Sequence, residues 1–233
     1  MKRFSLAIHD FRVSGAEATV FSLQKIQKDF PYPLTVHLVC DAPLLKGSQL
    51  AEFLIQQSQQ GSIEVVFHGL SHACPTSVGK RSAWFHKHQA EYLLGSSELV
   101  RNTQEMYQSL VSLFSAPLGI CPPCWLASAN NRKFLQSLAP AYIEGMLSLR
   151  AQGKRTWSPI VSLGSPNLSE LFYLRRLGSL MCFAAMLLPR ARVRVALHTC
   201  DLLEPSSMIF FANKVQWLLR RGVHPVLQRN LLQ

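Results

Sequence analysis

Short apolar runs alternate with longer stretches of helical periodicity along the whole 233-residue chain. Strands are predicted at 4–8, 34–40, 63–67, 118–121, 142–147, 158–162, 193–197 and, more weakly, 223–227. Helices are predicted at 15–30, 48–59, 91–114, 128–138, 167–188 and 206–221. The alternation favours a parallel sheet, because strands that are apolar throughout are typical of sheets covered on both faces. An open doubly wound sheet is one candidate, but the chain length better suits a compact β/α barrel forming one domain, residues 1–233.

The composition is that of an ordinary globular protein. Hydrophobic residues make up 48% and charged residues 16% of the chain, which excludes the disordered class. No uninterrupted apolar stretch approaches the ~20 residues of a membrane span. The apolar run at 4–8 is too short for an export signal, so we expect a cytoplasmic protein whose six cysteines are reduced thiols. The net charge of +11 raises the prospect of an anionic partner, but the basic residues are dispersed and no nucleic-acid motif accompanies them, so a solvated basic surface is favoured.

Polar residues gather where the predicted strands end. Asp10 follows the first strand, His68 and His72 follow the third, and His198 with Asp201 follows the strand at 193–197. The active site of a β/α barrel forms at the carboxyl ends of its strands. These residues, far apart in sequence, are therefore predicted to meet at one mouth of the barrel.

The spacing of His68 and His72 places two imidazoles within reach of one cation if the loop turns helically. Asp10 adds a carboxylate oxygen from another strand. Two histidines and one carboxylate, with open positions for water, form a catalytic ligand set for Zn²⁺ or Fe²⁺. In the alternative interpretation, His68 is a hydrogen-bonded core histidine and Asp10 only caps a turn.

Four short motifs together resemble those of a known superfamily. They are Ile8-His9-Asp10, the segment 68–72, Cys121-Pro122-Pro123-Cys124-Trp125-Leu126 and Leu197-His198. In order and spacing they resemble the polysaccharide deacetylases, the NodB-homology or carbohydrate esterase 4-like group, and are most similar to its divergent bacterial deacetylase-like branch. The resemblance extends from residue 4 to about residue 203.

This resemblance implies a distorted (β/α)7 barrel that removes acetyl groups from N-acetylated sugars with a bound divalent metal, taken here to be Zn²⁺. Asp10, His68 and His72 fall on the metal ligands of the superfamily. His198 falls on its general acid, and Asp201, three residues later, is expected to orient that imidazole. The metal would activate the attacking water and polarise the amide carbonyl.

The first motif departs from the superfamily pattern. It usually contains two adjacent aspartates, of which the first is the general base, and here that position is His9. A neutral imidazole has a suitable pKa for the role. Strand alternation, however, argues against His9 and Asp10 both facing the site. The arginine usual in the third motif is also missing, with Cys121-Pro122 in its place.

The positions of other residues in the predicted elements suggest further roles. Pro123 and Trp125 are expected to contact substrate, with Trp125 either stacking on a sugar or packing against the barrel rim. The stretches 71–89 and 151–157 are predicted to be loops that determine substrate choice. His37 is interpreted as structural. Alternating arginines at 190, 192 and 194 are expected at the mouth opposite the chemistry.

Three functions follow from these features. The leading one is a metal-dependent deacetylase acting on an N-acetylated carbohydrate or related small molecule. The second is a catalytically lapsed relative that binds a glycan or a protein, which His9 and the missing arginine favour. The third is nucleic-acid binding through the basic surface, which the dispersed charges do not favour.

Overall fold

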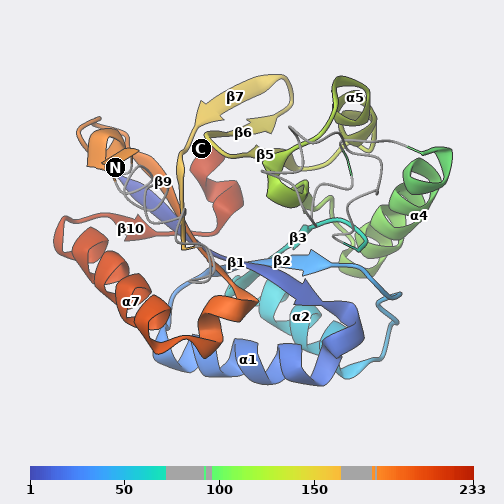
Figure 1. Ribbon diagram of the computed structural model, residues 1–233, viewed down its shortest axis with the longest axis horizontal. Helices are drawn as coiled ribbons and strands as arrows, with labels where there is room; N and C mark the ends of the chain where they lie inside the picture. The colour runs from blue at the N-terminus through green and yellow to red at the C-terminus, as the bar shows by residue number, and fades with distance from the viewer. Residues whose placement is uncertain (72–91, 93–95, 164–179, 182) are drawn as a thin grey trace, which may run out of the picture.

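A single ten-stranded sheet organises the chain in the computed structural model, which describes residues 1–71, 92, 96–163, 180–181 and 183–233. The strand order is β7-β6-β5-β4-β3-β2-β1-β9-β8, with β10 paired to β1 (Figure 1). The strands are β1 (Arg3–Arg12), β2 (Leu34–Val39), β3 (Ile63–Phe67), β4 (Gly119–Ile120), β5 (Tyr142–Gly145), β6 (Ser148–Ala151), β7 (Lys154–Trp157), β8 (Ile160–Leu163), β9 (Arg192–His198) and β10 (His224–Pro225). All pairings are parallel except β5–β6 and β6–β7.

The sheet curls until its two edges approach each other. The Ser158 amide donates to the Leu147 carbonyl at 2.9 Å, and the Ile160 amide donates to the Met146 carbonyl at 3.2 Å. These bonds hold the start of β8 against the turn between β5 and β6. Within the part of the chain that the structure describes, β7 and β8 do not pair, so the predicted barrel is a curled and incompletely closed sheet.

Helices cover the outer face of the curl. They are α1 (Ala16–Asp29), α2 (Gln49–Gln59), α4 (Ser97–Phe114), α5 (Ala129–Ser137) and α7 (Pro205–Arg220). α1 and α2 pack against each other below the sheet in Figure 1. The side chains of Ser48, Ser96 and Ser128 accept the first free amides of α2, α4 and α5, which fixes where these helices begin. The helix predicted at 91–114 therefore starts at Ser97, while most of the one predicted at 167–188 lies outside the described residues.

Strand alternation gives the two faces of the sheet opposite chemistry. Phe4, Leu6 and Ile8 of β1 belong to the main hydrophobic core beneath the helices. Ser5 and His9 on the same strand are also buried but face the inside of the curl, as does Arg194 of β9. The inside of the sheet is consequently lined by small and ionisable side chains beside a small apolar cluster that includes Val66, Tyr142 and Leu149.

One stretch differs from its predicted structure. The strand predicted at 142–147 ends at Gly145, and residues 151–157, predicted to be a loop, form most of the β6–β7 hairpin. Gln152 and Gly153 both have positive φ, of 46° and 76°, as a two-residue type I′ turn requires. A Gln-Gly turn is a weak sequence signal for a hairpin, which explains why pattern alone missed it.

Two further expectations concern cysteines and membranes. Cys121 and Cys200 are free thiols, as predicted for these two. Among the described residues, no helix has both the length and the apolar character needed to traverse a bilayer.

Candidate metal and substrate site

A bulge in β1 turns two consecutive side chains toward the same mouth of the curl. Ile8 pairs with Val36, but the next pair is Phe11 with Leu38, so β1 contains one extra residue. Asp10 adopts a left-handed φ of 68°, which aspartate tolerates better than most residues. His9 and Asp10 both contact His68 as a result. The prediction that His9 and Asp10 point to opposite faces of the sheet is therefore wrong, because the bulge changes the direction of the side chain that follows it.

His68 presents one defined nitrogen to this mouth. Its Nδ1 lies 2.8 Å from the Cys121 carbonyl oxygen, which can only accept, so Nδ1 carries the proton. Its Nε2 faces Asp10 Oδ1 and His9 Nδ1, each 3.3 Å away. A metal-binding histidine is commonly oriented in this way, through its second nitrogen and a backbone carbonyl.

The donor atoms fit a divalent cation. Bonds of 2.0–2.1 Å in a tetrahedral zinc site separate neighbouring ligand atoms by about 3.3–3.4 Å. Asp10 Oδ1 and His9 Nδ1 each lie at 3.3 Å from His68 Nε2. His72, the third predicted ligand, lies outside the described residues. Asp10 and His68 are thus brought together as predicted, and His9 joins them.

A layer of fully buried ionisable residues lies behind this mouth. The His37 ring stacks on His9 with centroids 3.7 Å apart, and its Nε2 lies 2.7 Å from Glu144 Oε2. Glu144 also accepts from the guanidinium of Arg194, from Gln228 Nε2 at 2.6 Å and from Trp125 Nε1 at 3.2 Å. Burial alone would raise the pKa of Glu144, but His37 and Arg194 hold this pKa well below its usual range. Glu144 is therefore an ionised, fully satisfied carboxylate.

Arg194 contradicts its predicted placement. The expectation put all three alternating arginines at the opposite mouth, and Arg190 and Arg192 do line a small cavity there with Arg3. Arg194, two residues further along β9, is instead fully buried inside the curl. Its guanidinium donates to Glu144 and to the carbonyls of Ser158, Gly145 and Met146. It thereby ties β9 to β5 and to the start of β8.

His9, His37 and Cys121 offer a second group of potential ligand atoms, all within 4.8 Å of one another. The rings of His9 and His37 are, however, nearly parallel, with an interplanar angle of 8°. Imidazole binds a metal in the plane of its ring, so two stacked rings do not direct their lone pairs at one point. Burial and the nearby Glu144 also raise the pKa of the Cys121 thiol, which keeps it protonated. Asp10 and His68 are better oriented as candidate ligands.

His9 is a neutral imidazole in this setting. Its side chain is 1% exposed, and burial together with neighbouring His37 and His68 lowers its pKa well below the ordinary value. Its Nε2 makes no hydrogen bond to any described residue. His9 can accept a proton, but more weakly than an exposed histidine would.

His198 lies at the mouth with Asp201 beside it. The His198 ring is 5.3 Å from the His9 ring, and its side chain is 20% exposed. Asp201 is fully buried, and its Oδ2 accepts the His198 amide at 2.9 Å while lying 3.6 Å from His198 Nδ1. The structure therefore places the predicted acid next to the residue expected to orient it.

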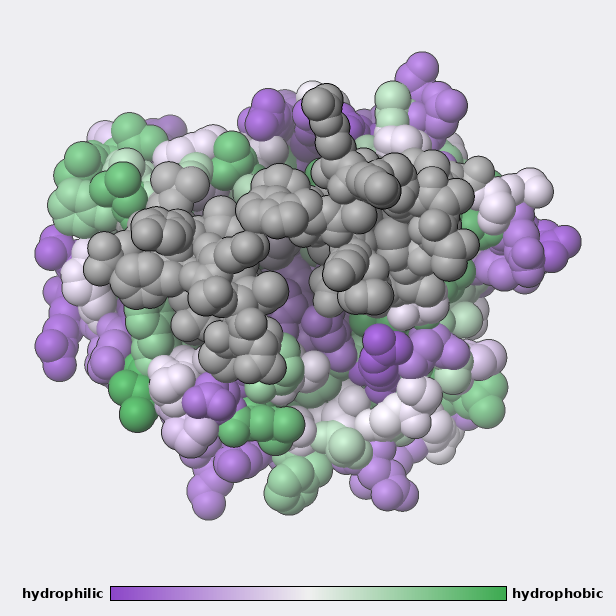
Figure 2. All heavy atoms as spheres, in the orientation of Figure 1, coloured by the Kyte–Doolittle hydropathy of each residue, from purple (hydrophilic) through white to green (hydrophobic). Residues whose placement is uncertain are grey.

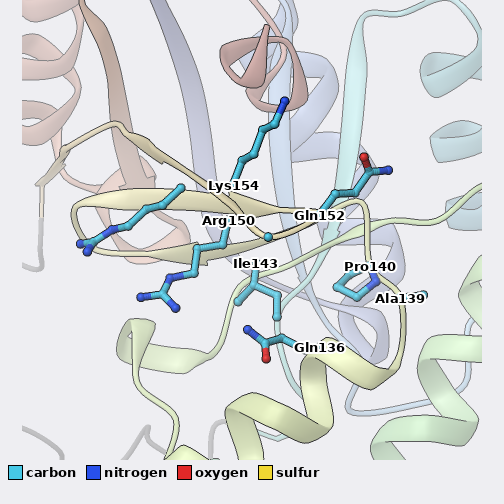
Figure 3. A pocket seen from close by; sticks show the side chains of 9 residues that line it. Gln136, Ala139, Pro140, Ile143, Arg150, Gln152 and Lys154 are labelled. Atoms are coloured by element: carbon cyan, nitrogen blue, oxygen red, sulfur yellow. The ribbon is translucent and has the colours of Figure 1, made fainter.

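Trp125 lies at the boundary between the mouth and an outer groove. It follows Pro123 in a short 3-10 turn and has a φ of 58°. Its indole edge faces the His9 ring at 5.5 Å, while its Nε1 bonds to Glu144. It also lines a cavity of about 260 Å³, which adjoins a larger one of about 630 Å³ beneath the β6–β7 hairpin. Figure 3 shows the larger cavity between the hairpin and the end of α5.

No protein-family model matches the sequence, and no curated protein sequence matches it significantly. Solved structures do match. The peptidoglycan N-acetylglucosamine deacetylase Bc1960 aligns with a TM-score of 0.55 at 12% identity, over 98% of this chain and 87% of that one. BA3943 from Bacillus anthracis, described as a CE4 family pseudoenzyme, aligns with a TM-score of 0.50 at 13% identity, over 100% of this chain and 66% of that one. The chain has the fold of the CE4 deacetylases.

A BA3943 mutant with restored enzymatic activity aligns similarly, with a TM-score of 0.51 at 13% identity, over 100% of this chain and 68% of that one. The CE4 fold thus includes both an active enzyme and a pseudoenzyme among the matched structures. The predicted distorted barrel of the polysaccharide deacetylase type is confirmed as a fold.

Sequence reasoning missed the buried layer behind the mouth. His37, Glu144 and Arg194 are ionisable residues at buried positions of largely apolar strands. The one available signal was that each interrupts a strand buried on both faces, where an ionisable residue needs a partner. Which partner it finds depends on the curl of the sheet.

Proposed function

We propose that this protein is a divalent-metal-dependent deacetylase acting on an N-acetylated saccharide. The observation that carries the proposal is the 3.3 Å separation of Asp10 Oδ1 and His68 Nε2, with His68 oriented by the Cys121 carbonyl. Two imidazoles and a carboxylate favour Zn²⁺. The CE4 fold supports the reaction class, and the Bc1960 enzyme that shares the fold is a deacetylase of N-acetylglucosamine in peptidoglycan.

A divalent cation held here would polarise the amide carbonyl and activate water. The residues of the chain supply proton transfer and positioning. His198, at the exposed side of the mouth, donates a proton to the departing amine, and the buried carboxylate of Asp201 fixes its backbone amide and lies 3.6 Å from its Nδ1. His9 is the group nearest to the ligands that is able to accept a proton from water.

Metal content tests the proposal directly. Purified protein is expected to bind one Zn²⁺, while Asp10→Asn and His68→Ala lose at least tenfold in zinc affinity. His224→Ala is the matched control, since His224 is an exposed histidine on β10, far from the mouth in sequence and strand position. Equal zinc binding in all four proteins, or none in the wild type, would contradict a metal site at Asp10 and His68.

A second function deserves a test because of the position of His9. Its Nδ1 lies at ligand distance from His68 Nε2, so His9 is placed to be a metal ligand. In that role His9 no longer serves as the base, and the protein becomes a metal-loaded binding protein for an acetylated glycan. The pseudoenzyme BA3943 shows that the fold supports such a loss of activity.

Hydrolysis separates the two functions. An active deacetylase releases acetate from tetra-N-acetylchitotetraose, and His198→Ala is expected to reduce the rate of this release roughly 100-fold or more. If the protein only binds its glycan, the wild type releases no acetate. The His9→Asp variant, which places a carboxylate at the base position, is then expected to gain measurable turnover. Turnover in the wild type that survives His198→Ala would argue against the proposed acid.

A further inference from the structure

A row of three side chains crosses the outer face of the sheet beside the mouth. The strand register places Ile143 of β5 opposite Arg150 of β6, and Arg150 opposite Arg155 of β7. These three residues line both the 630 Å³ cavity and the 260 Å³ cavity. The two cavities therefore form one groove, which we call the hairpin groove.

The hairpin groove is strongly basic. Besides Arg150 and Arg155, its lining includes Lys154 at the hairpin end and Arg132 on α5. None of these four makes an ion pair with any residue that the structure describes. Among the described residues of the lining, the acidic residue is Glu144, which already accepts hydrogen bonds from Arg194, His37, Gln228 and Trp125. The positive charge of the groove is thus left unneutralised by the described part of the chain.

Two of these cations stand in an unfavourable arrangement. Arg150 and Arg155 are directly opposite each other across β6 and β7, where like charges destabilise a hairpin. Arg155 is also held in place, because its Nε donates to Ser148 Oγ at 2.9 Å. Its terminal guanidinium nitrogens remain available for a bidentate acceptor. A local electrostatic conflict of this kind marks a position where an anion would relieve repulsion.

The walls of the groove suit a saccharide. Figure 3 shows Gln136, Ala139 and Pro140 at the α5 side, facing Ile143 and Arg150 of the sheet. Amide side chains hydrogen-bond to hydroxyl groups, and the half-buried Pro140 offers an apolar surface for a ring. In Figure 2, hydrophilic side chains gather along the top of the view, over the β6–β7 hairpin and α5.

The groove also leads to the reaction site. Its smaller cavity reaches Pro122 and Trp125, and the Trp125 ring lies 5.5 Å from that of His9. We propose that the hairpin groove binds a carboxylate or phosphate group of an anionic saccharide, whose neighbouring N-acetylated residue lies at the mouth. This inference rests on the proposed function for the identity of the mouth, and it names the class of substrate.

Binding of paired oligosaccharides tests the proposal by calorimetry. Hyaluronan tetrasaccharide carries carboxylates, and tetra-N-acetylchitotetraose is its neutral counterpart. N-acetylglucosamine-1-phosphate against N-acetylglucosamine repeats the comparison for phosphate, so the two pairs show which anion the groove prefers. In 50 mM salt we expect the wild type to bind at least one anionic probe roughly tenfold more tightly than its neutral partner. A ten-nucleotide single-stranded DNA is included as an unrelated polyanion.

The groove variant, Arg150→Gln/Arg155→Gln, is expected to bind the anionic and the neutral probe with affinities that differ by about twofold or less. The control variant, Arg101→Gln/Arg220→Gln, removes the same amount of charge from exposed positions on α4 and α7. It is expected to bind the anionic probe as selectively as the wild type does. The groove variant should melt at an unchanged or slightly higher temperature, because it removes the cross-strand repulsion. Zinc content, which tests the mouth, should be equal in all these proteins.

Several results would overturn the inference. They are an absence of binding by both anionic probes, an equal affinity for charged and neutral partners, and a preference that survives in the groove variant. DNA binding as tight as that of the preferred saccharide, lost in the same variant, would assign the groove to nucleic acid. Because zinc binding and acetate release are measured separately, a failed groove is distinguishable from a failed metal site.

Discussion

Two neighbouring layers inside the curled sheet use the same residue types for different purposes. The inner layer, His37, Glu144 and Arg194, is joined by direct hydrogen bonds, such as the 2.7 Å contact between His37 and Glu144. In the mouth layer, made up of Asp10, His68 and His198, Asp10 Oδ1 lies 3.3 Å from His68 Nε2, and His198 Nδ1 lies 3.6 Å from Asp201 Oδ2. The inner layer is a closed hydrogen-bonded network, whereas the side chains of the mouth layer converge at longer separations. The difference teaches that ionisable residues buried with complete hydrogen bonding contribute to stability, whereas the convergent side chains at the mouth are placed to serve the proposed function.

The largest expected effect comes from opening the inner layer. Glu144→Ala leaves Arg194 buried without its carboxylate, and breaking a buried pair in this way costs about 3–5 kcal/mol of unfolding free energy. Urea denaturation measures this loss. A cost below about 1 kcal/mol would show that the inner layer is dispensable for stability.

The next effect is a dependence of stability on pH. Burial lowers the pKa of His37, against an opposing contribution from Glu144, and lowers the pKa of His9 further. An unfolded histidine titrates near 6.5, so the unfolded chain binds more protons below that pH, and stability is lost as the pH falls. Each histidine contributes up to about 1.4 kcal/mol per pH unit.

Metal-free protein unfolded in urea at pH 7.5, 6.5 and 5.5 shows this slope. His37→Gln, whose amide keeps a donor toward Glu144, is expected to give a shallower slope because one titrating group is gone. Glu144 itself, whose pKa is lowered, loses its contribution only below about pH 4.3. Equal stability at pH 7.5 and 5.5 in the wild type would contradict neutral buried histidines.

A smaller effect is expected where the two layers meet. Trp125→Phe keeps an aromatic ring against His9 but removes one of the donors to Glu144. Because Glu144 retains three other partners, the cost should be about 1 kcal/mol in thermal or urea unfolding. A loss as large as that of Glu144→Ala would mean that Trp125 organises the inner layer rather than bordering it.

The smallest effect on stability is expected in the mouth layer. Asn tolerates a left-handed φ as well as Asp does, so Asp10→Asn should change unfolding free energy by less than about 0.5 kcal/mol in metal-free protein. The same variant should lose zinc affinity. Should it unfold as readily as Glu144→Ala, the distinction between the two layers would be wrong.

Much of the fold was predictable because local patterns decide it. The strand at 63–67 was predicted with its observed bounds, and α1, α2, α5 and α7 begin and end within a residue or two of their predicted limits. Periodicity and capping residues act over a few neighbouring positions, so they can be recognised from the sequence alone. The β6–β7 hairpin was missed because its Gln-Gly turn carries a weak signal.

The meeting of Asp10 and His68 also followed from sequence, since parallel strands bring their carboxyl ends to one edge. The orientation of His9 did not, because it depends on one extra residue in β1 and a left-handed Asp10. Arg194 was misplaced for a related reason, since only the curl of the sheet brings it within reach of Glu144, 50 residues away in the chain.

The motif around Asp10 shows both what the sequence determines and what only the tertiary structure decides. The sequence by itself determined the strands, the covering helices and the edge at which the ionisable residues collect, because these depend on patterns of neighbouring side chains. Only the tertiary structure decided which residues pair within the inner layer, which way His9 points and where the basic hairpin groove lies. Those outcomes depend on contacts between strands distant in sequence, whose energies appear only once the sheet has curled.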